Sequence, residues 1–388
     1  MTSTPESLDW ITRLCRIDST SRDSNKPVID LVVEECRRLG IEPHVFDSPD
    51  GLKQGLVATI PAADGGTTGG VVLSGHTDVV PVDGQDWSSD PFEPEIRDGR
   101  LYGRGTADMK SYLGVILHLL PEIVAAQLSE PIHLAFSYDE EVGCRGGDAI
   151  VEQINSLALA PRAALVGEPT SMRVIRAHKS VNLFTVAFTG VNAHSSLTAN
   201  GVNAVEYAAE LVCWWRAKAD DWRLNGPFEE GFPLTYTTAG VNQFGGGTAV
   251  NIVPGQATAV LEFRSIPAVD PDDVLTELRA TVDELRERMQ AEHPQADVAL
   301  TVDAMVPGLD TPVDAAPAEL AHAIGGLRCE DKVTYGTEAG QFARGGIPAV
   351  VCGPGDIVQA HTADEFIELT QIAACEKYLR ELVKKITV

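Results

Sequence analysis

The chain has 388 residues, of which 44% are hydrophobic and 22% charged, proportions that are ordinary for a soluble globular protein. Because one hydrophobic core rarely extends beyond about 250 to 300 residues, we expect two domains. The 56 acidic residues outnumber the 30 basic ones and give a net charge of −26, which argues against nucleic acid or an anionic membrane as a partner, since both would repel the chain.

The cysteines and the N-terminus favour a cytoplasmic protein. The seven cysteines are odd in number, widely spaced and never arranged as Cys-x-x-Cys, a pattern that favours free thiols in a reducing compartment. The first seven residues contain neither a basic region nor an apolar run typical of a secretion signal. No apolar segment approaches the ~18 residues of a membrane span.

Short apolar runs alternate with helical patterns in the first half of the chain. Residues 24–39 predict a helix that ends at Gly40, and residues 55–60 predict a strand. Near-continuous apolar runs follow at 71–73, 132–136, 163–166 and 347–351, and a helical pattern covers 112–120. Strands buried on both faces have this composition, so we expect an α/β fold with a mostly parallel sheet covered by helices.

The pattern changes between residues 179 and 304. In chain order we predict a strand (181–189), a helix (202–217), two strands (234–240 and 256–264), a second helix capped by Asp270 and a last strand (298–302). This β-α-β-β-α-β order predicts a small ferredoxin-like domain. We therefore expect a main domain of residues 1–178 and 305–388, interrupted by an inserted domain of residues 179–304. A final helix is expected over about 363–385.

Histidines and carboxylates lie at the ends of the predicted parallel strands. His76, Glu140-Glu141, Glu168 and His361 each follow one of the apolar runs, and Asp108 precedes the helical pattern at 112–120. Taken singly, each has an ordinary explanation, as a core or surface histidine or as a helix cap. Because ligands of α/β sheets bind at the carboxyl ends of the strands, we expect these side chains to form one metal site.

Charge balance favours two metal ions rather than one. Asp108, Glu141 and Glu168 together with a bridging hydroxide carry four negative charges, which two divalent ions would cancel. Asp108 is the candidate bridge. Adjacent Glu140 and Glu141 can point in different directions, so one can bind metal while the other acts as general base. Asp78 could accept the second N–H of His76 and fix its tautomer.

Five segments resemble the motifs of the di-zinc aminoacylase, carboxypeptidase and deacylase family. They are residues 74–81 (SGHTDVVP), 102–110 (YGRGTADMK), 139–141 (DEE), 167–170 (GEPT) and 360–365 (AHTADE). The resemblance runs over essentially the whole chain. It implies two Zn²⁺ ions, with Co²⁺ as an alternative: His76 and Glu168 would hold one ion, Glu141 and His361 the other, Asp108 would bridge them, and Glu140 would be the base.

The same resemblance assigns roles in the inserted domain. That domain would be a lid that also mediates a homodimer. His194 would stabilise the oxyanion, while Asn251 and Arg264 would bind the substrate carboxylate; a structural ion pair is the alternative for Arg264. The peptide Asp108-Met109 would be cis. Residues 336–342 and 352–355 resemble the acetylornithine deacetylase branch, in which Glu338 would meet a substrate ammonium group.

The expected activity is hydrolysis of the amide bond of a small N-acylated amino acid, most closely N2-acetyl-L-ornithine. Glu140 would accept a proton from a water activated by the two metals. The alternatives are a desuccinylase of succinyl-diaminopimelate, another N-acyl-amino-acid deacylase or a dipeptidase, and, from a different class, a non-catalytic binding protein on the same scaffold. Since no nucleotide-binding motif is evident, we expect no nucleotide cofactor.

Overall fold

The computed structural model describes residues 4–388, so the first three residues of the N-terminal segment considered above lie outside it. The chain forms two compact units: Met1–Ala177, Leu309–Asp331 and Thr337–Val388 make up the first, and His178–Gly308 with Lys332–Gly336 the second. From the sequence we expected the domain boundaries to fall between residues 178 and 179 and between residues 304 and 305. The segment 332–336 belongs to the second unit because Lys332 donates its backbone N–H to the Gly231 carbonyl (3.0 Å) and pairs with Glu229.

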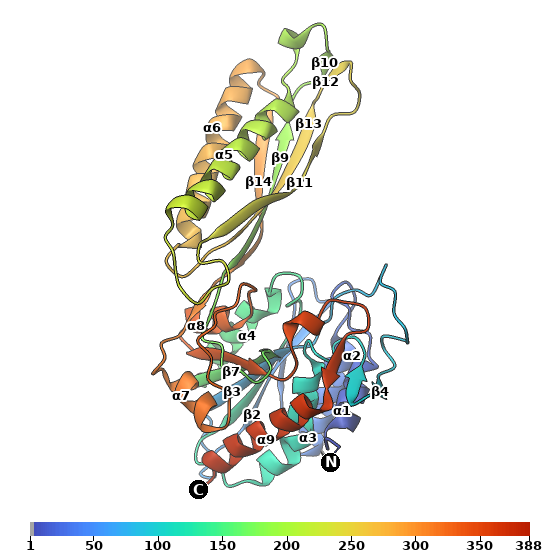
Figure 1. Cartoon of the computed structure of the whole chain (residues 1–388), viewed down its shortest axis with the longest axis vertical. Helices are drawn as coiled ribbons and strands as arrows, with labels where there is room; N and C mark the ends of the chain where they lie inside the picture. Colours follow the sequence, from blue (N-terminus) through green and yellow to red (C-terminus); the bar gives the residue numbers. More distant parts are fainter. Residues whose placement is uncertain (1–3) are drawn as a thin grey trace. The chain divides into compact units, whose positions relative to one another are not determined.

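A six-stranded sheet organises the first unit (Figure 1). Its order is β1 (His44–Asp47), β2 (Gln54–Ile60), β6 (Ile132–Ser137), β3 (Val71–His76), β7 (Ala163–Pro169) and β16 (Ala349–Gly353). The last four strands are mutually parallel, whereas β2 is antiparallel to both of its neighbours. The expected mostly parallel α/β sheet is confirmed, and it brings the carboxyl ends of β6, β3, β7 and β16 to one edge.

Helices cover this sheet on both faces. Val71 and Leu73 of β3 join one hydrophobic cluster with α1 (Leu8–Cys15), α2 (Lys26–Arg38), α3 (Lys110–Ala125), α7 (Ala316–Ala323) and α9 (Leu369–Lys385). Side chains alternate between the two faces along a strand, so Val72 points to the other face of the sheet, and it lies outside that cluster. The helices α4 (Arg145–Ser156) and α8 (Ala339–Arg344) pack on that opposite side.

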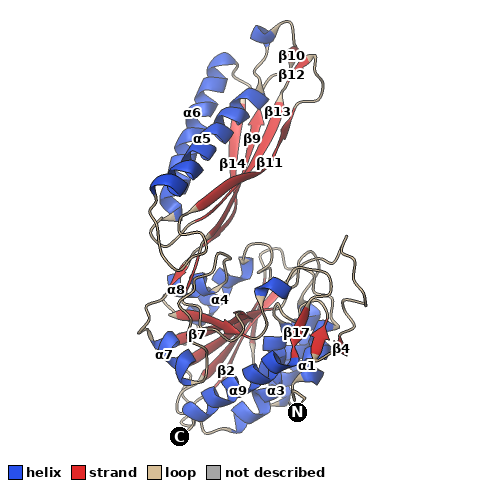
Figure 2. Ribbon diagram, viewed as in Figure 1, coloured by secondary structure: helices blue, strands red, loops and turns tan. Residues whose placement is uncertain are grey.

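The second unit has the predicted β-α-β-β-α-β order. Its antiparallel sheet runs β11 (Thr238–Gly246), β13 (Gln256–Arg264), β9 (Val181–Thr189) and β14 (Asp297–Val306). Both long helices, α5 (Ala204–Asn225) and α6 (Pro271–Glu292), cover one face of this sheet (Figure 2). Trp215, Phe263 and Leu278 are fully buried in the shared core. This unit therefore has its own hydrophobic core.

Short elements complete the structure. A three-stranded sheet joins β17 (Phe366–Glu368), β5 (Arg100–Tyr102) and β4 (Glu95–Arg97). The pairs β8 (Ala177–His178) with β15 (Leu309–Asp310) and β10 (Ala193–His194) with β12 (Ile252–Val253) are two residues long, and the 3-10 turns are η1 (Thr198–Asn200) and η2 (Ile357–Gln359). Because residues 366–368 are a strand, the last helix begins at Leu369, later than expected.

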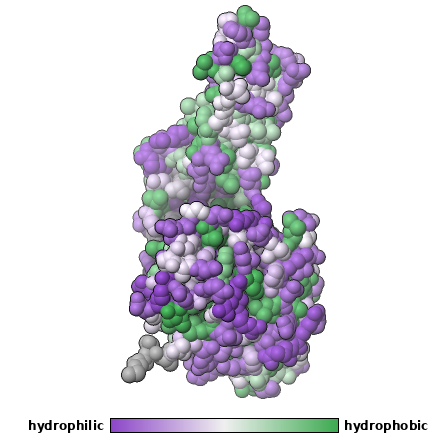
Figure 3. Space-filling view, turned by 90° about the vertical axis from the view of Figure 1, so that its right-hand side faces the viewer, coloured by the Kyte–Doolittle hydropathy of each residue, from purple (hydrophilic) through white to green (hydrophobic). Residues whose placement is uncertain are grey.

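Hydrophilic side chains predominate on the face drawn in Figure 3, with hydrophobic residues scattered between them. Among residues 4–388, no helix is both long enough and apolar enough to cross a membrane.

Candidate metal centre

Two groups of potential metal ligands lie at the carboxyl edge of the large sheet and share one residue. The first group is His76, Asp108 and Glu168, and the second is Asp108, Glu141 and His361; within each group the ligand atoms lie within 4.8 Å of one another. Asp108 contributes one oxygen to each side, since its Oδ1 lies 2.9 Å from His76 Nε2 and its Oδ2 3.4 Å from His361 Nε2. The structure thus brings all five predicted ligands together, with Asp108 between the others.

His76 ends strand β3 with its side chain fully buried. Its Nδ1 lies 2.9 Å from the backbone carbonyl of Asp78, and donation there leaves Nε2 as the ligand atom facing Asp108 and Glu168. We predicted that the carboxylate of Asp78 would be the acceptor. That carboxylate lies 3.6 Å from Nδ1. Asp78 is therefore the partner of His76, but through its backbone carbonyl rather than its carboxylate.

The Asp78 carboxylate instead holds the segment that follows strand β6. It accepts the backbone N–H groups of Glu140 (3.1 Å) and Glu141 (3.3 Å) and the hydroxyl of Ser21 (2.7 Å). Asp78 is fully buried, so these bonds replace the water that its charge would otherwise need. It therefore fixes the backbone from which both glutamates project.

Glycine allows a close approach at the strand that carries Glu168. A Cβ atom on Gly167 would lie 2.1 Å from the ring of Tyr112 in helix α3, so only glycine fits between this helix and β7. The neighbouring Glu168 is consequently held near His76, with only 4% of its surface exposed.

The donor set fits divalent metal ions. One carboxylate oxygen of Glu141 and one of Glu168 are buried without a hydrogen-bond partner among residues 4–388, an arrangement that is costly unless something else satisfies them. Imidazole nitrogens and carboxylate oxygens are the ligands that Zn²⁺ accepts. Each group of candidate ligands contains one unpartnered oxygen, so the two groups together suit two ions.

The pKa shifts of these residues also favour the binding of cations. Burial, followed by the charge of Asp108, raises the pKa of Glu168 well above its usual value and that of Glu141 to about 7. Hydrogen bonds to Asp108 and Glu141 raise the pKa of His361 to about 10. These groups therefore hold protons that bound cations would displace, and we expect metal uptake to release protons.

Glu140 lies beside the centre but belongs to neither group of candidate ligands in the described chain. Its Oε1 accepts the thiol S–H of Cys144 at 3.2 Å, and burial raises its pKa well above the usual value. Cys144, which precedes helix α4 in a left-handed conformation (φ 49°), was not singled out from the sequence. A carboxylate with a raised pKa next to metal ligands is suited to accept and return a proton.

Glu338 is buried in the first unit. It lies immediately before helix α8 with 1% of its surface exposed, and its Oε1 has no hydrogen-bond partner in the described part of the chain. Burial raises its pKa to about 7. Its role toward a substrate ammonium group stays a prediction.

The remaining predicted site residues belong to the second unit. The structure places His194 and Asn251 together: strand β10, which contains His194, pairs with β12, and Ser195 donates its N–H to the Asn251 carbonyl (3.0 Å). Arg264 lies at the opposite end of strand β13, where it donates to Glu262 (2.8 Å) and to the Thr334 carbonyl (3.3 Å). Arg264 thus has the structural ion pair that was its alternative explanation.

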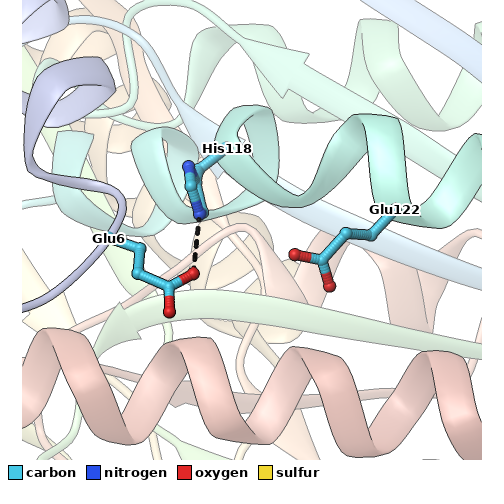
Figure 4. A group of neighbouring side chains, drawn as sticks. All are labelled: Glu6, His118 and Glu122. Atoms are coloured by element: carbon cyan, nitrogen blue, oxygen red, sulfur yellow. Dashed lines mark ion pairs between the residues drawn. The ribbon is translucent and has the colours of Figure 1, made fainter.

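A third cluster of metal-binding residue types lies away from this edge. Glu6 and His118 form an ion pair (3.5 Å), and Glu122 is one helical turn beyond His118 (Figure 4). Arg380 donates to Glu6 (2.7 Å) and to both oxygens of Glu122 (3.0 and 3.1 Å), and both glutamates are exposed. Because this guanidinium already supplies the positive charge, we assign no metal to the cluster.

Comparison with known families and sequences gives concordant matches. Residues 72–385 match the model of peptidase family M20/M25/M40. The chain is 33% identical to an acetylornithine deacetylase of Proteus mirabilis over 376 residues, which cover 95% of this chain and 92% of the relative. It is 32% identical to an acetylornithine deacetylase of Myxococcus xanthus, covering 96% and 95%.

Solved structures of lower identity have the same fold. An M20 family metallo-carboxypeptidase of Sulfolobus solfataricus superimposes with a TM-score of 0.75 at 21% identity, covering 98% of each chain. The YXEP protein of Bacillus subtilis, described as a dinuclear metal binding peptidase, has a TM-score of 0.61 at 16% identity and covers 98% of this chain and 100% of its own.

Proposed function

The chain belongs to peptidase family M20/M25/M40, and from this premise we propose that it hydrolyses N2-acetyl-L-ornithine to L-ornithine and acetate, a step of arginine biosynthesis. The family and the relatives make it a metal-dependent hydrolase of amide bonds. The observation that carries the finer proposal is the name shared by four relatives of 31 to 33% identity that match at least 93% of this chain.

The metal centre supports the proposed chemistry. His76 and Glu168 would hold one divalent ion, Glu141 and His361 the other, and Asp108 would contact both. When bound, the ions polarise the amide carbonyl and lower the pKa of water at the site. We propose Zn²⁺, because two imidazoles and three carboxylates suit it; Co²⁺ is the alternative that elemental analysis would reveal.

In the proposed reaction Glu140 moves the proton. It accepts a proton from the attacking water while the new C–O bond forms, and it donates that proton to the nitrogen as the C–N bond breaks. Its Oε1 is held by the Cys144 thiol, and its backbone is fixed by Asp78. One carboxyl group can therefore serve both steps without moving its backbone.

The proposal assigns the residues outside the metal centre to substrate. His194 would stabilise the negative charge on the carbonyl oxygen, Asn251 and Arg264 would bind the carboxylate, and Glu338 would meet the side-chain ammonium group. We also propose that two chains associate through the second unit, and that the protein is cytoplasmic; the latter is supported by seven cysteines that are all free thiols.

A substrate panel tests the proposed function. The metal-loaded protein would be assayed for amine release from N2-acetyl-L-ornithine, N-succinyl-diaminopimelate, other N-acetyl amino acids and a dipeptide. We expect kcat/KM for N2-acetyl-L-ornithine to exceed that for each alternative by about tenfold or more, the discrimination that a single well-placed contact can give. A higher value for the succinyl compound or the dipeptide would assign the chain to that activity instead.

A further inference from the structure

A buried glutamate connects the two segments that carry Asp108 and His361. Glu365 Oε1 accepts the backbone N–H groups of Ala107 (2.9 Å) and Asp108 (3.1 Å), and its Oε2 accepts Arg104 Nη1 (2.6 Å). The side chains of Glu365 and Arg104 are each 1% exposed. The backbone of the shared ligand is thus held by a carboxylate that lies only four residues beyond His361 in the chain.

The connection continues from Arg104 back to His361. Arg104 Nη2 donates to Gln85 Oε1 (2.5 Å), and Gln85 Nε2 donates to the backbone carbonyl of His361 (3.0 Å). The ring of Trp87 lies 5.1 Å from the guanidinium of Arg104. A continuous set of hydrogen bonds therefore runs from the Asp108 backbone through Glu365, Arg104 and Gln85 to His361.

The backbone of His361 has an uncommon conformation. Its φ is 62°, in the left-handed region that a residue with a side chain seldom adopts, and its side chain is 52% exposed. Besides the bond from Gln85, the segment after His361 is held by Ser88, whose N–H and hydroxyl both donate to Asp364 (2.9 Å). The residues 85–88 therefore hold the loop that presents this ligand.

We propose that Glu365 and Gln85 are positioning residues for the two metal ions and that they act unequally. Glu365 orients Asp108, which belongs to both ligand groups, so it supports both ions. Gln85 orients His361, which belongs to one group, so it supports only the ion bound by Asp108, Glu141 and His361. The inference rests on the proposed metal centre and adds a division of labour among residues that touch no metal.

Zinc binding to the metal-free protein tests this division. Protein stripped with a chelator would be titrated with Zn²⁺ alone, in competition with a chromophoric chelator, to give two dissociation constants. We expect Gln85→Leu to weaken one site by about 10- to 100-fold, the usual effect of losing a residue that orients a ligand, and to leave the other unchanged. Glu365→Gln should weaken both sites. The control substitution Glu93→Gln should weaken neither, because the side chain of Glu93 forms an exposed ion pair with Arg16.

A double-mutant comparison identifies the weakened site. In a His361→Ala background, Gln85→Leu should cause no further loss, whereas Glu365→Gln should still weaken the remaining ion. Circular dichroism verifies that each variant folds. If Glu365→Gln does not fold, the zinc affinities of Gln85→Leu still test the proposal, because Gln85 is only partly buried.

The outcomes separate this inference from the proposed function. If the wild type binds no zinc, the metal centre itself is wrong. If the wild type binds two ions and Gln85→Leu binds both with unchanged affinity, or loses affinity equally at both sites, the proposed positioning role of Gln85 is overturned while the metal centre stands.

Discussion

Glu140 and Glu141 are neighbours in the chain with different surroundings. In the described structure, Glu141 lies 2.9 Å from His361 and has a buried oxygen without a hydrogen-bond partner, whereas Glu140 lies outside both ligand groups and accepts the S–H of Cys144. The backbone N–H groups of both residues donate to the Asp78 carboxylate. The difference in surroundings separates a ligand from a proton carrier.

The substitution Glu140→Gln tests this separation. The amide keeps the size of the side chain but cannot accept the proton, so we expect kcat to fall by about 10²- to 10⁴-fold. Both ions should remain bound, because Glu140 belongs to neither ligand group. Steady-state kinetics and elemental analysis of the same preparation check the two statements, and turnover close to that of the wild type would contradict the assignment.

At the residue scale, the sequence predicted which residue types gather but not which atoms meet. Histidines and acids at successive strand ends sufficed to group four of the five ligands, because parallel strands deliver their carboxyl ends to one edge. The fifth, Asp108, precedes helix α3. The carbonyl of Asp78, the thiol of Cys144 and the carboxylate of Glu365 could not be assigned, since each role depends on the path of a loop. Glu365 and Arg104 lie within recognised motifs, and that was the only signal available for them.

At the element scale, local signals were sufficient where capping and periodicity agree. Asp270 was predicted to cap helix α6, and its side chain accepts the N–H of Asp272. Strand β11 was expected at 234–240 but runs over Thr238–Gly246, because pairing with β13 sets its limits despite three glycines and a bulge after Val241. Tertiary pairing of this kind leaves no local signal.

Strand β8 carries a histidine that should make stability depend on pH. Burial lowers the pKa of His178 to about 4, although the side chain bonds to the Lys179 carbonyl. Because the unfolded chain protonates near pH 6.5 and the folded one does not, this group stabilises the fold above that pH. That contribution falls by about 3 kcal/mol as pH drops from 6.5 to 4.

Urea unfolding of His178→Asn and wild type checks this dependence. Trp214, Trp215 and Trp222 lie in the second unit and report on it by fluorescence. We expect the wild type to lose more unfolding free energy than the variant between pH 7 and pH 5. Parallel losses in the two proteins would show that His178 does not contribute.

At the scale of the whole molecule, the two edges of the second sheet differ in charge. Within the described residues, strand β11 pairs with a single strand, β13. It contains no charged residue, and its Phe244 is 47% exposed. Strand β14, at the other edge, carries Asp297 and Asp303. Charged residues discourage pairing of sheet edges, so β11 is the edge better suited to meet a second chain.

The proposed dimer can therefore be tested with matched substitutions at the two edges. Light scattering of the wild type should give twice the 41.5 kDa of one chain. Phe244→Asp should yield monomers, because a buried, unpaired carboxylate opposes association. Val302→Asp, at a position of β14 that is 39% exposed, should leave the dimer intact. A monomeric wild type would refute the dimer, and dissociation by Val302→Asp alone would move the interface to β14.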